Sequence, residues 1–146
     1  MKTKYIFSIL FITIFFMSCE VNQQGLRKFH GNWNIDKMEY YEVSGGSYTL
    51  VTTTNDAGYF QLYDQMYDDQ ENDCIYKFNT NLTSYFATAL GTSGSCLWYC
   101  PAKNQIDFTG ASATSVTVVK KNTNNMEWTY KSGNFKEVFT LKRIDI

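Results

Sequence analysis

The sequence is poor in proline and histidine. Pro101 and His30 are the single representatives of their types among 146 residues. One histidine with no serine, cysteine or carboxylate at a recognised spacing does not make a catalytic triad. It also leaves Cys96 and Cys100 without the partners that a zinc site needs. The sequence therefore predicts neither an enzyme nor a zinc protein, and no cofactor is expected.

Basic clusters and long amphipathic helices are missing as well. Without residues 1–18, which contain Lys2 and Lys4, the 13 basic residues fall to 11, against 14 acidic ones. A nucleic-acid-binding domain carries a basic stripe or patch, and none is present. No apolar period of 3.6 residues persists over three turns after residue 18. These absences argue against a nucleic-acid partner and against a helical bundle.

Carboxylates gather in one segment without an intervening lysine or arginine: Asp64, Asp68, Asp69, Glu71 and Asp73. Oxygen-rich loops can hold calcium, but the Asp-x-Asp-x-Asp-Gly spacing is missing. We interpret the segment as a solvated acidic loop. No metal site is predicted.

The N-terminal segment combines a basic start with a short apolar run. Lys2 and Lys4 precede residues 5–17, which are interrupted only by Ser8 and Thr13. A transmembrane helix needs roughly 20 apolar residues, whereas the apolar region of a secretory signal has about 7–15. The segment is therefore predicted to be a signal peptide.

The apolar run ends in Phe-Met-Ser-Cys at residues 16–19, which resembles the lipobox of bacterial lipoproteins. In that family a peptidase cuts before the cysteine, whose thiol carries a diacylglycerol. The resemblance implies lipidation of Cys19 and a membrane partner through this anchor. It divides the chain into a signal peptide (residues 1–18), a lipidated cysteine with a short tether (residues 19–25) and a folded domain (residues 26–146). The implied location is the bacterial outer membrane, facing the periplasm, with the cell surface as the alternative.

The folded domain has the composition of β-strands. Aromatic residues make up 17% of the chain, with 11 tyrosines and 11 phenylalanines, and threonine and valine recur. Such side chains suit a pleated, half-buried surface. Cys74, Tyr76 and Phe78 show the period of two that marks a strand with one buried face. A change of parity near residues 36–37 predicts a β-bulge in the first strand.

Turn signals such as residues 44–46 and 91–95 separate eight to ten short strands. One of the expected strands covers residues 84–90, and a helical turn is expected at residues 26–29. Turn spacings of about 8–12 residues are typical of a meander, sandwich or barrel. The predicted fold is all-β: an antiparallel up-and-down meander that closes into a barrel of eight, at most ten, strands. Closure is favoured because it removes exposed sheet edges.

Gly31-Asn32-Trp33 resembles the Gly-x-Trp motif at the start of the first barrel strand of lipocalins. Residues 139–144 resemble the last lipocalin strand, in which an arginine lies over that tryptophan. The lipocalin motif built around Thr-Asp-Tyr has no match between these two segments. The resemblance implies a lipocalin-like barrel of a small bacterial lipoprotein. It gives Gly31, Trp33 and Arg143 a structural role in closing one end of the barrel.

Lipidation of Cys19 would leave three cysteines in an oxidising compartment, enough for one disulfide and one free thiol. Cys96 and Cys100 would lie about 13 Å apart on an extended strand. A disulfide needs Cα atoms within roughly 7 Å, so this pair requires a bend, for example at Pro101. Cys74 and Cys96 begin their strands at the same rim of a meander. The favoured disulfide is therefore Cys74–Cys96.

An eight-stranded barrel can fill its interior with side chains or hold one small ligand. The first hypothesis is a cup for a small apolar or amphipathic ligand, lined by five aromatic residues: Tyr63, Tyr76, Tyr85, Tyr99 and Trp128. The alternative is a filled barrel that acts through its loops as a protein-interaction or inhibitor module on an envelope or external protein. The volume of the interior separates the two hypotheses.

Overall fold

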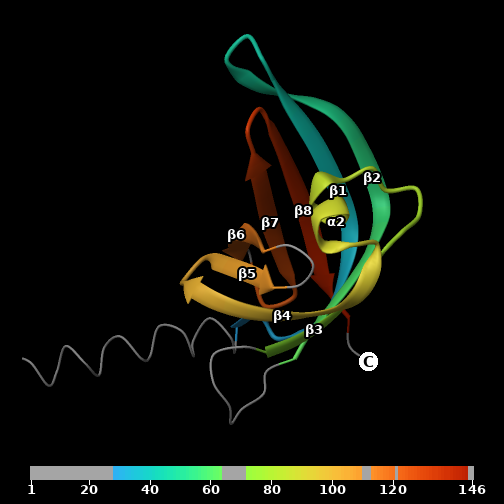
Figure 1. The fold of residues 1–146 in the computed structure, drawn as a ribbon, viewed down its shortest axis with the longest axis vertical. Helices are drawn as coiled ribbons and strands as arrows, with labels where there is room; N and C mark the ends of the chain where they lie inside the picture. The colour runs from blue at the N-terminus through green and yellow to red at the C-terminus, as the bar shows by residue number, and fades with distance from the viewer. Residues whose placement is uncertain (1–27, 64–71, 110–112, 121, 145–146) are drawn as a thin grey trace, which may run out of the picture.

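The computed structural model describes residues 28–63, 72–109, 113–120 and 122–144. Its elements are β1 (Gly31–Ser44), β2 (Ser47–Leu62), β3 (Asn72–Phe78), α2 (Tyr85–Leu90), β4 (Ser93–Ala102), β5 (Gln105–Thr109), β6 (Thr114–Lys120), β7 (Asn125–Ser132) and β8 (Phe135–Arg143) (Figure 1). Lys28 and Phe29 are also helical, as expected for residues before β1. Over these described ranges, no helix is long and apolar enough to cross a membrane. The predicted signal peptide, Cys19 and the tether lie outside the described residues.

The eight strands form a closed barrel in which each strand pairs with the next one in sequence. The barrel closes because β8 pairs with β1, from Arg143 opposite Trp33 to Phe135 opposite Glu42. All eight pairings are antiparallel. The predicted up-and-down meander and its closure with eight strands are confirmed.

Alternation along the strands builds the core. In β3, four alternate residues are buried and the three between them are exposed. In β1 the register shifts between Ile35 and Lys37, so that Trp33 and Ile35 are buried on one parity and Met38 on the other. The bulge predicted near residues 36–37 is therefore confirmed. It keeps apolar side chains pointing into the barrel on both sides of the irregularity.

Residues 84–90, expected to form a strand, instead form the helix α2. The Ser84 hydroxyl accepts a hydrogen bond from the amide of Ala87 at 3.0 Å, which is an N-cap. Gly91 ends the helix with a φ of +104°, a conformation that favours glycine. Phe86 and Leu90, four residues apart, are both buried, so the segment has the helical period after all. The strand prediction was wrong because the two caps decide the structure of so short a segment.

One end of the barrel, which we call the closed end, is formed by the predicted Gly-x-Trp and arginine residues. The Arg143 guanidinium carbon lies 4.6 Å from the centroid of the Trp33 ring, and Arg143 Nη2 donates to the His30 carbonyl at 3.0 Å. Trp33 Nε1 donates to the Phe29 carbonyl at 2.8 Å. Gly31 has a φ of +128°, and a Cβ there would lie 2.9 Å from Arg143 Nη1. A side chain at Gly31 would displace the guanidinium, and the φ of +128° itself favours glycine.

Cys74 and Cys96 form a disulfide between β3 and β4, as predicted. The two residues are direct partners in the register of these strands, with their Cα atoms 5.0 Å apart. Cys100 is free and buried. Burial, with a smaller contribution from Asp107, raises the pKa of its thiol to about 12. Cys100 is therefore an inert core residue rather than a reactive cysteine.

Replacing Arg143 tests the closure. Arg143→Gln should lower the free energy of unfolding by ~0.5–2 kcal/mol, because it removes the cation–π contact with Trp33. Lys142→Gln, at the exposed neighbouring position, is the matched control and should change stability little. Urea denaturation of the two variants measures the difference. Equal losses in both would show that the guanidinium does not stabilise the closed end.

Candidate functional site

The end of the barrel opposite the closed end, here called the mouth, is covered by α2. In the chain, α2 follows β3 and precedes β4. Figure 1 shows it lying across the upper part of the barrel. Phe86 of α2 is fully buried, and its ring centroid lies 5.3 Å from that of Phe139 and 5.8 Å from that of Phe108. It also lies 6.2 Å from the Phe60 ring and 5.5 Å from the Tyr130 ring. Phe86 therefore inserts into the barrel as part of the core.

The interior below α2 is filled with aromatic side chains. Phe60 lies near its centre, with ring centroids of Trp128 at 4.8 Å, Phe108 at 5.5 Å and Phe78 at 5.5 Å. All four of these side chains are at most 2% exposed. Of the two options for a barrel of this size, the described residues adopt the packed interior.

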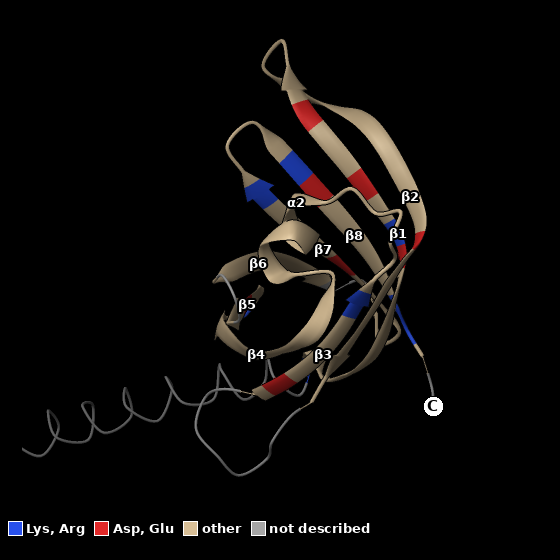
Figure 2. Ribbon diagram, turned by 45° about the vertical axis from the view of Figure 1, so that its right-hand side comes forward, with Lys and Arg blue, Asp and Glu red and all other residues tan. Residues whose placement is uncertain are grey.

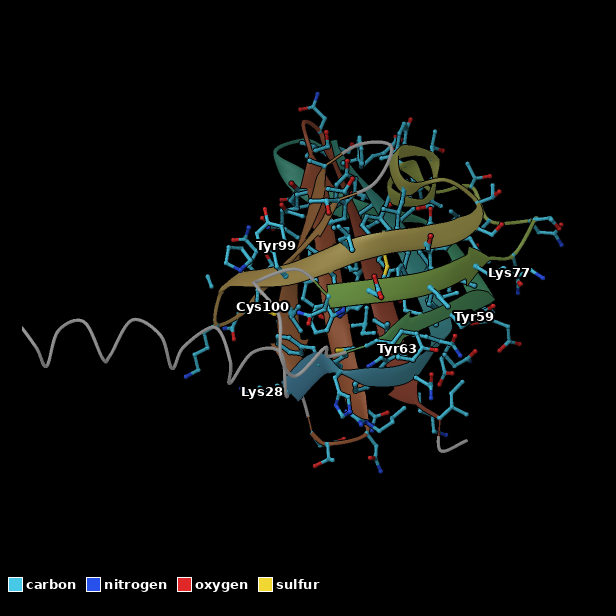
Figure 3. The ribbon with its side chains drawn as sticks, turned by 60° about the horizontal axis from the view of Figure 1, so that its bottom comes forward. Lys28, Tyr59, Tyr63, Lys77, Tyr99 and Cys100 are labelled. Atoms are coloured by element: carbon cyan, nitrogen blue, oxygen red, sulfur yellow. A yellow bond between two sulfur atoms is a disulfide. The ribbon has the colours of Figure 1, made fainter. Side chains whose placement is uncertain are left out.

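The five residues predicted to line a cup are not brought together. Trp128 and Tyr76 do face the interior, where they pack against Phe60. Tyr63 is 45% exposed, and Tyr85 on α2 is 52% exposed. Tyr99 alternates with the buried residues of β4 and faces outward; Figure 3 labels it and Tyr63. The five side chains were grouped because they are aromatic. In the structure, alternation along the strands and the helical conformation of residues 85–90 point them in different directions.

The buried carboxylate of Glu137 holds the first turn of α2. Glu137, on β8, is 0% exposed, and its Oε2 accepts from the Ser84 hydroxyl at 2.9 Å. The same oxygen accepts from the Phe86 amide at 3.0 Å, and Oε1 accepts from the Tyr85 amide at 2.7 Å. Burial raises the pKa of Glu137, and the three hydrogen bonds oppose that shift. These contacts satisfy helix amides that would otherwise be buried without acceptors.

Tyr76 holds the other end of the helix. Its hydroxyl, on β3, donates to the Leu90 carbonyl at 2.5 Å. A Cβ at Gly91 or Gly94 would lie 3.2 or 3.3 Å from this hydroxyl, so two glycines leave space for it. Burial raises the pKa of Tyr76, which keeps the hydroxyl protonated as a donor. Both ends of α2 are thus fixed by side chains of the barrel wall.

Sequence reasoning missed Glu137. A signal was present, because Glu137 has the same parity as Phe139 and Leu141, which point into the barrel. A carboxylate at an interior position of a strand requires donors, and the donors belong to a segment that was predicted as a strand.

Three aromatic side chains cover the mouth from outside, and we call them the mouth cluster: Tyr40, Tyr85 and Phe135. Tyr85 stacks on Phe135 with ring centroids 4.2 Å apart. Tyr40 lies 5.9 Å from Tyr85 and 6.0 Å from Phe135. The cluster joins α2 to β1 and β8, so that the helix is packed from above as well as from below.

The β1–β2 hairpin extends beyond the mouth. We call residues 40–55 the arm; Figure 1 shows it rising above the rest of the barrel. Four of its apolar side chains are exposed: Val43, Tyr48, Leu50 and Val51. Exposed apolar residues that gather on one projecting element are typical of interaction surfaces.

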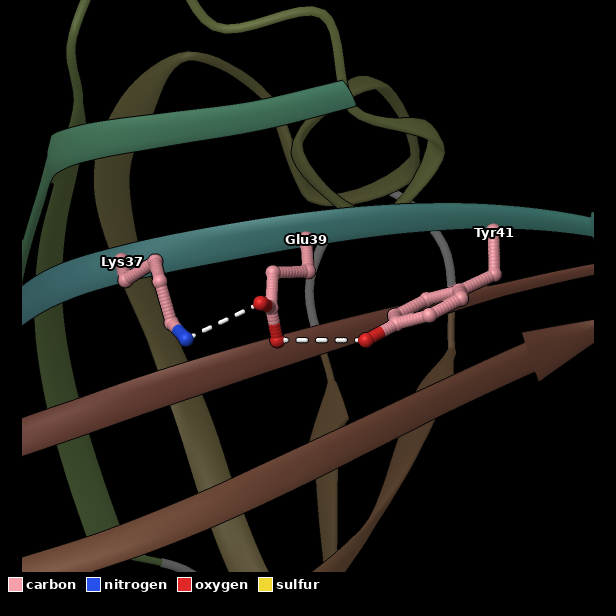
Figure 4. A network of polar contacts seen from close by, with 3 residues as sticks. All are labelled: Lys37, Glu39 and Tyr41. Atoms are coloured by element: carbon pink, nitrogen blue, oxygen red, sulfur yellow. Dashed lines mark hydrogen bonds and ion pairs between the residues drawn. The ribbon is translucent and has the colours of Figure 1, made fainter. Parts of the chain in front are cut away.

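Polar contacts cross the outer face of β1 and extend onto the arm. The Lys37 ammonium lies 2.9 Å from Glu39 Oε1, and the Tyr41 hydroxyl donates to Glu39 Oε2 at 3.3 Å (Figure 4). Lys136 of β8 lies 4.3 Å above the Tyr41 ring and 4.8 Å above the Tyr48 ring. The hydrogen bond to Glu39 raises the pKa of Lys37, and burial raises that of Tyr41. These contacts fix the arm to β8.

A hollow of about 220 Å³ lies against β1 and β2 near the closed end. It is lined by Asn32, Trp33, Asn34, Tyr59, Phe60, Gln61 and Ile144. Ligand pockets usually measure about 300–1,000 Å³, so this hollow is small for one. Among the described residues, no group of three or more histidine, cysteine or carboxylate side chains could hold a metal ion. Of the acidic segment singled out above, residues 64–71 lie outside the described part of the chain.

No family model matches this chain, and no curated protein matches it. Among solved structures, a redesigned β-barrel is similar, with 13% sequence identity and a TM-score of 0.46. The match covers 83% of this chain and 96% of the other. At this identity and TM-score the likeness adds nothing to the fold, which follows from the strand pairings above.

Replacing Glu137 with glutamine tests the attachment of α2. A raised pKa means that folded Glu137 keeps its proton at pH values where the unfolded chain has released it. Its contribution to stability is therefore largest below pH 4.5, the ordinary value, and is lost as the pH rises through the raised folded value. Glu137→Gln should abolish this part of the pH dependence. It should also speed amide exchange in α2, because glutamine offers one acceptor oxygen instead of two.

Urea denaturation at a series of pH values, with amide exchange of residues 85–87, measures both effects. Glu42→Gln, on the exposed arm, is the matched control. An unchanged difference between wild type and Glu137→Gln across the pH range would contradict the burial effect at this carboxylate.

Proposed function

We propose that the protein is a lipocalin-like lipoprotein of the bacterial envelope whose filled barrel serves as a protein-interaction module. The lipid anchor is Cys19, and the recognising surface is the arm together with the mouth cluster. The partner is an envelope protein or an external protein such as an attacking enzyme. The lipobox-like residues 16–19 and the Gly-x-Trp residues support the first part of the proposal, and the packed interior supports the second.

The observation that carries the interaction hypothesis is the position of Phe86. Because this side chain fills the top of the interior, a recognition surface would have to lie on the outside of the described barrel. The exposed apolar side chains of the arm, such as Leu50 and Val51 at 48% and 55% exposure, are available there. Apolar side chains on a projecting strand offer contact area that a partner can bury.

The anchor would present the arm away from the membrane. Cys19 precedes Lys28 by nine residues, a stretch that can span at most about 30 Å at roughly 3.5 Å per residue. Lys28 and Phe29 adjoin the closed end, since the Phe29 carbonyl accepts from Trp33 Nε1. The closed end would then face the lipid, and the mouth and arm would face outward.

Photocrosslinking in the producing cells tests this proposal. A photoreactive phenylalanine analogue at Leu50 should give a discrete adduct with another envelope or external protein. The same analogue at Ile75 is the matched control, because Ile75 is 40% exposed but lies on β3, away from the arm. Adducts with a second copy of the chain are identified by mass and counted separately. Equal labelling from both positions, or no foreign adduct from Leu50, would contradict the proposal.

A second candidate function, binding of a small apolar or amphipathic ligand, is favoured by the construction of α2. The helix is six residues long, and its polar attachments to the barrel are at its two ends, through Glu137 and Tyr76. Displacement of Phe86 would open a space lined by Phe60, Phe108 and Phe139. A ligand of this class would replace the Phe86 ring.

Lauric acid serves as the probe for this second function. If the barrel carries ligands, the acid should bind saturably and should speed amide exchange at residues 85–87, because α2 must leave. Phe86→Ala should lose about 3–5 kcal/mol of stability and bind the probe more tightly, since the space is already open. Thr88→Ala, which shortens an exposed side chain of the same helix outside the mouth cluster, is the control. An absence of saturable binding to wild type would contradict ligand carriage.

A further inference from the structure

The upper half of β2 has no strand on its outer side among the described residues. β2 pairs with β3 only through residues 58–62. Asn79 covers the next part of the edge, because its amide donates to the Ala57 carbonyl at 3.0 Å and its side chain donates to the Asp56 carbonyl. Residues 47–55, which we call the free edge, pair with β1 on their other side. Backbone donors and acceptors therefore point outward along this stretch.

The free edge lacks the side chains that usually protect such a strand. Its sequence, Ser-Tyr-Thr-Leu-Val-Thr-Thr-Thr-Asn, contains no charged residue and no proline. Figure 2 shows charged residues on β1, β7 and β8, while the upper part of β2 is uncharged. Natural edge strands usually carry lysine or proline to prevent pairing with another chain. Here the charged residues lie on strands that pair on both sides, and the unpaired segment, residues 47–55, carries no charge.

We propose that the free edge binds the free edge of a second copy of this chain, in an antiparallel pair related by a two-fold axis. In the register centred on Val51, Tyr48 lies opposite Thr54 and Thr49 lies opposite Thr53. Aromatic–β-branched pairs and Thr–Thr pairs are favourable across antiparallel strands. The two barrels would share one sheet that runs from β8 and β1 of one copy, through both β2 strands, to β1 and β8 of the other.

A second copy suits this strand because a two-fold axis brings each residue near its own equivalent. Any charged residue in the interface would then be introduced twice, with like signs close together. The nine residues of the free edge contain none, so self-pairing meets no such repulsion. The register shift opposite Tyr40 and Tyr41 leaves Val51 as an extra residue in β2. This irregularity twists the strand but places no charge or proline on its edge.

The interface is small, since nine residues a side fall below the ≈ 20–30 residues of a standard interface. Association is therefore expected to be reversible and concentration-dependent. The free edge is part of the arm, but this proposal rests on its unpaired backbone and not on a foreign partner. Self-association in the absence of any other protein therefore tests it separately from the protein-interaction function.

Sedimentation velocity and amide exchange of the full chain in detergent micelles, over a range of protein concentrations, test the proposal. The sedimentation coefficient of wild type should rise with concentration, and exchange at residues 47–55 should slow in parallel. Val51→Lys and Thr53→Lys should each weaken association by about tenfold, because symmetry introduces each charge twice. Thr53→Lys would place its ammonium opposite Glu39 of β1, which favours a folded variant.

Ile75→Lys is the matched control. Ile75 is exposed like the edge residues but lies on β3, which pairs with strands on both sides. This variant should associate as wild type does. Association that persists in Val51→Lys and Thr53→Lys would overturn the proposal, since another surface would be responsible. A wild type that stays monomeric at every concentration, with unchanged exchange at residues 47–55, would overturn it as well.

Discussion

The contact between the Glu137 carboxylate and the first turn of α2 is the constraint on which the upper half of this barrel depends. A short helix gains little from its own hydrogen bonds, and α2 is only six residues long. The carboxylate replaces the missing acceptors and places Phe86 where five other rings meet it. The hydrogen bonds of Glu137 therefore both hold α2 over the mouth and place Phe86 in the interior.

The two ends of the barrel are built in different ways. At the closed end, Arg143 covers Trp33 beside Gly31, so the end is sealed by residues of the first and last strands. At the mouth, the helix α2, which lies between β3 and β4 in the chain, covers the barrel. The side chains of Glu137 and Tyr76 hold its two ends by hydrogen bonds. Among the described residues, four of the ten exposed large apolar side chains lie on the arm, which adjoins this second end. Recognition is therefore expected at the mouth and arm rather than at the closed end.

Alternation and end motifs made much of the fold predictable. Strand parity indicated the meander, and the bulge after Ile35 followed from a change in that parity. The Trp33–Arg143 pair was implied by the resemblance to lipocalins. The Cys74–Cys96 pairing is also confirmed, although the reason for it differs. Because residues 84–90 form α2 and not a strand, β3 and β4 are antiparallel neighbours, and the two cysteines face each other across them. The site was not predictable in the same way. Tyr63, Tyr85 and Tyr99 were assigned to a cup by composition, whereas their directions depend on local parity and on the caps of α2.

Glu137 and the free edge were not predicted because their partners, or the lack of them, depend on residues distant in the chain. Glu137 has its donors more than fifty positions earlier in the chain, so no local pattern connects them. The free edge is also invisible in the sequence, because a neutral strand in the middle of a sheet and a neutral strand at its edge read alike. Only the short pairing of β2 with β3 distinguishes the two cases.

Native mass spectrometry of the protein, purified gently from the cells that make it, tests the central claim that the barrel is filled by its own side chains. The account predicts the mass of the chain from Cys19 onward with the proposed lipid, in single copies or in pairs, and no further component. A reproducible additional mass that is released when the protein is denatured would contradict it, and would identify the barrel as a carrier of that molecule.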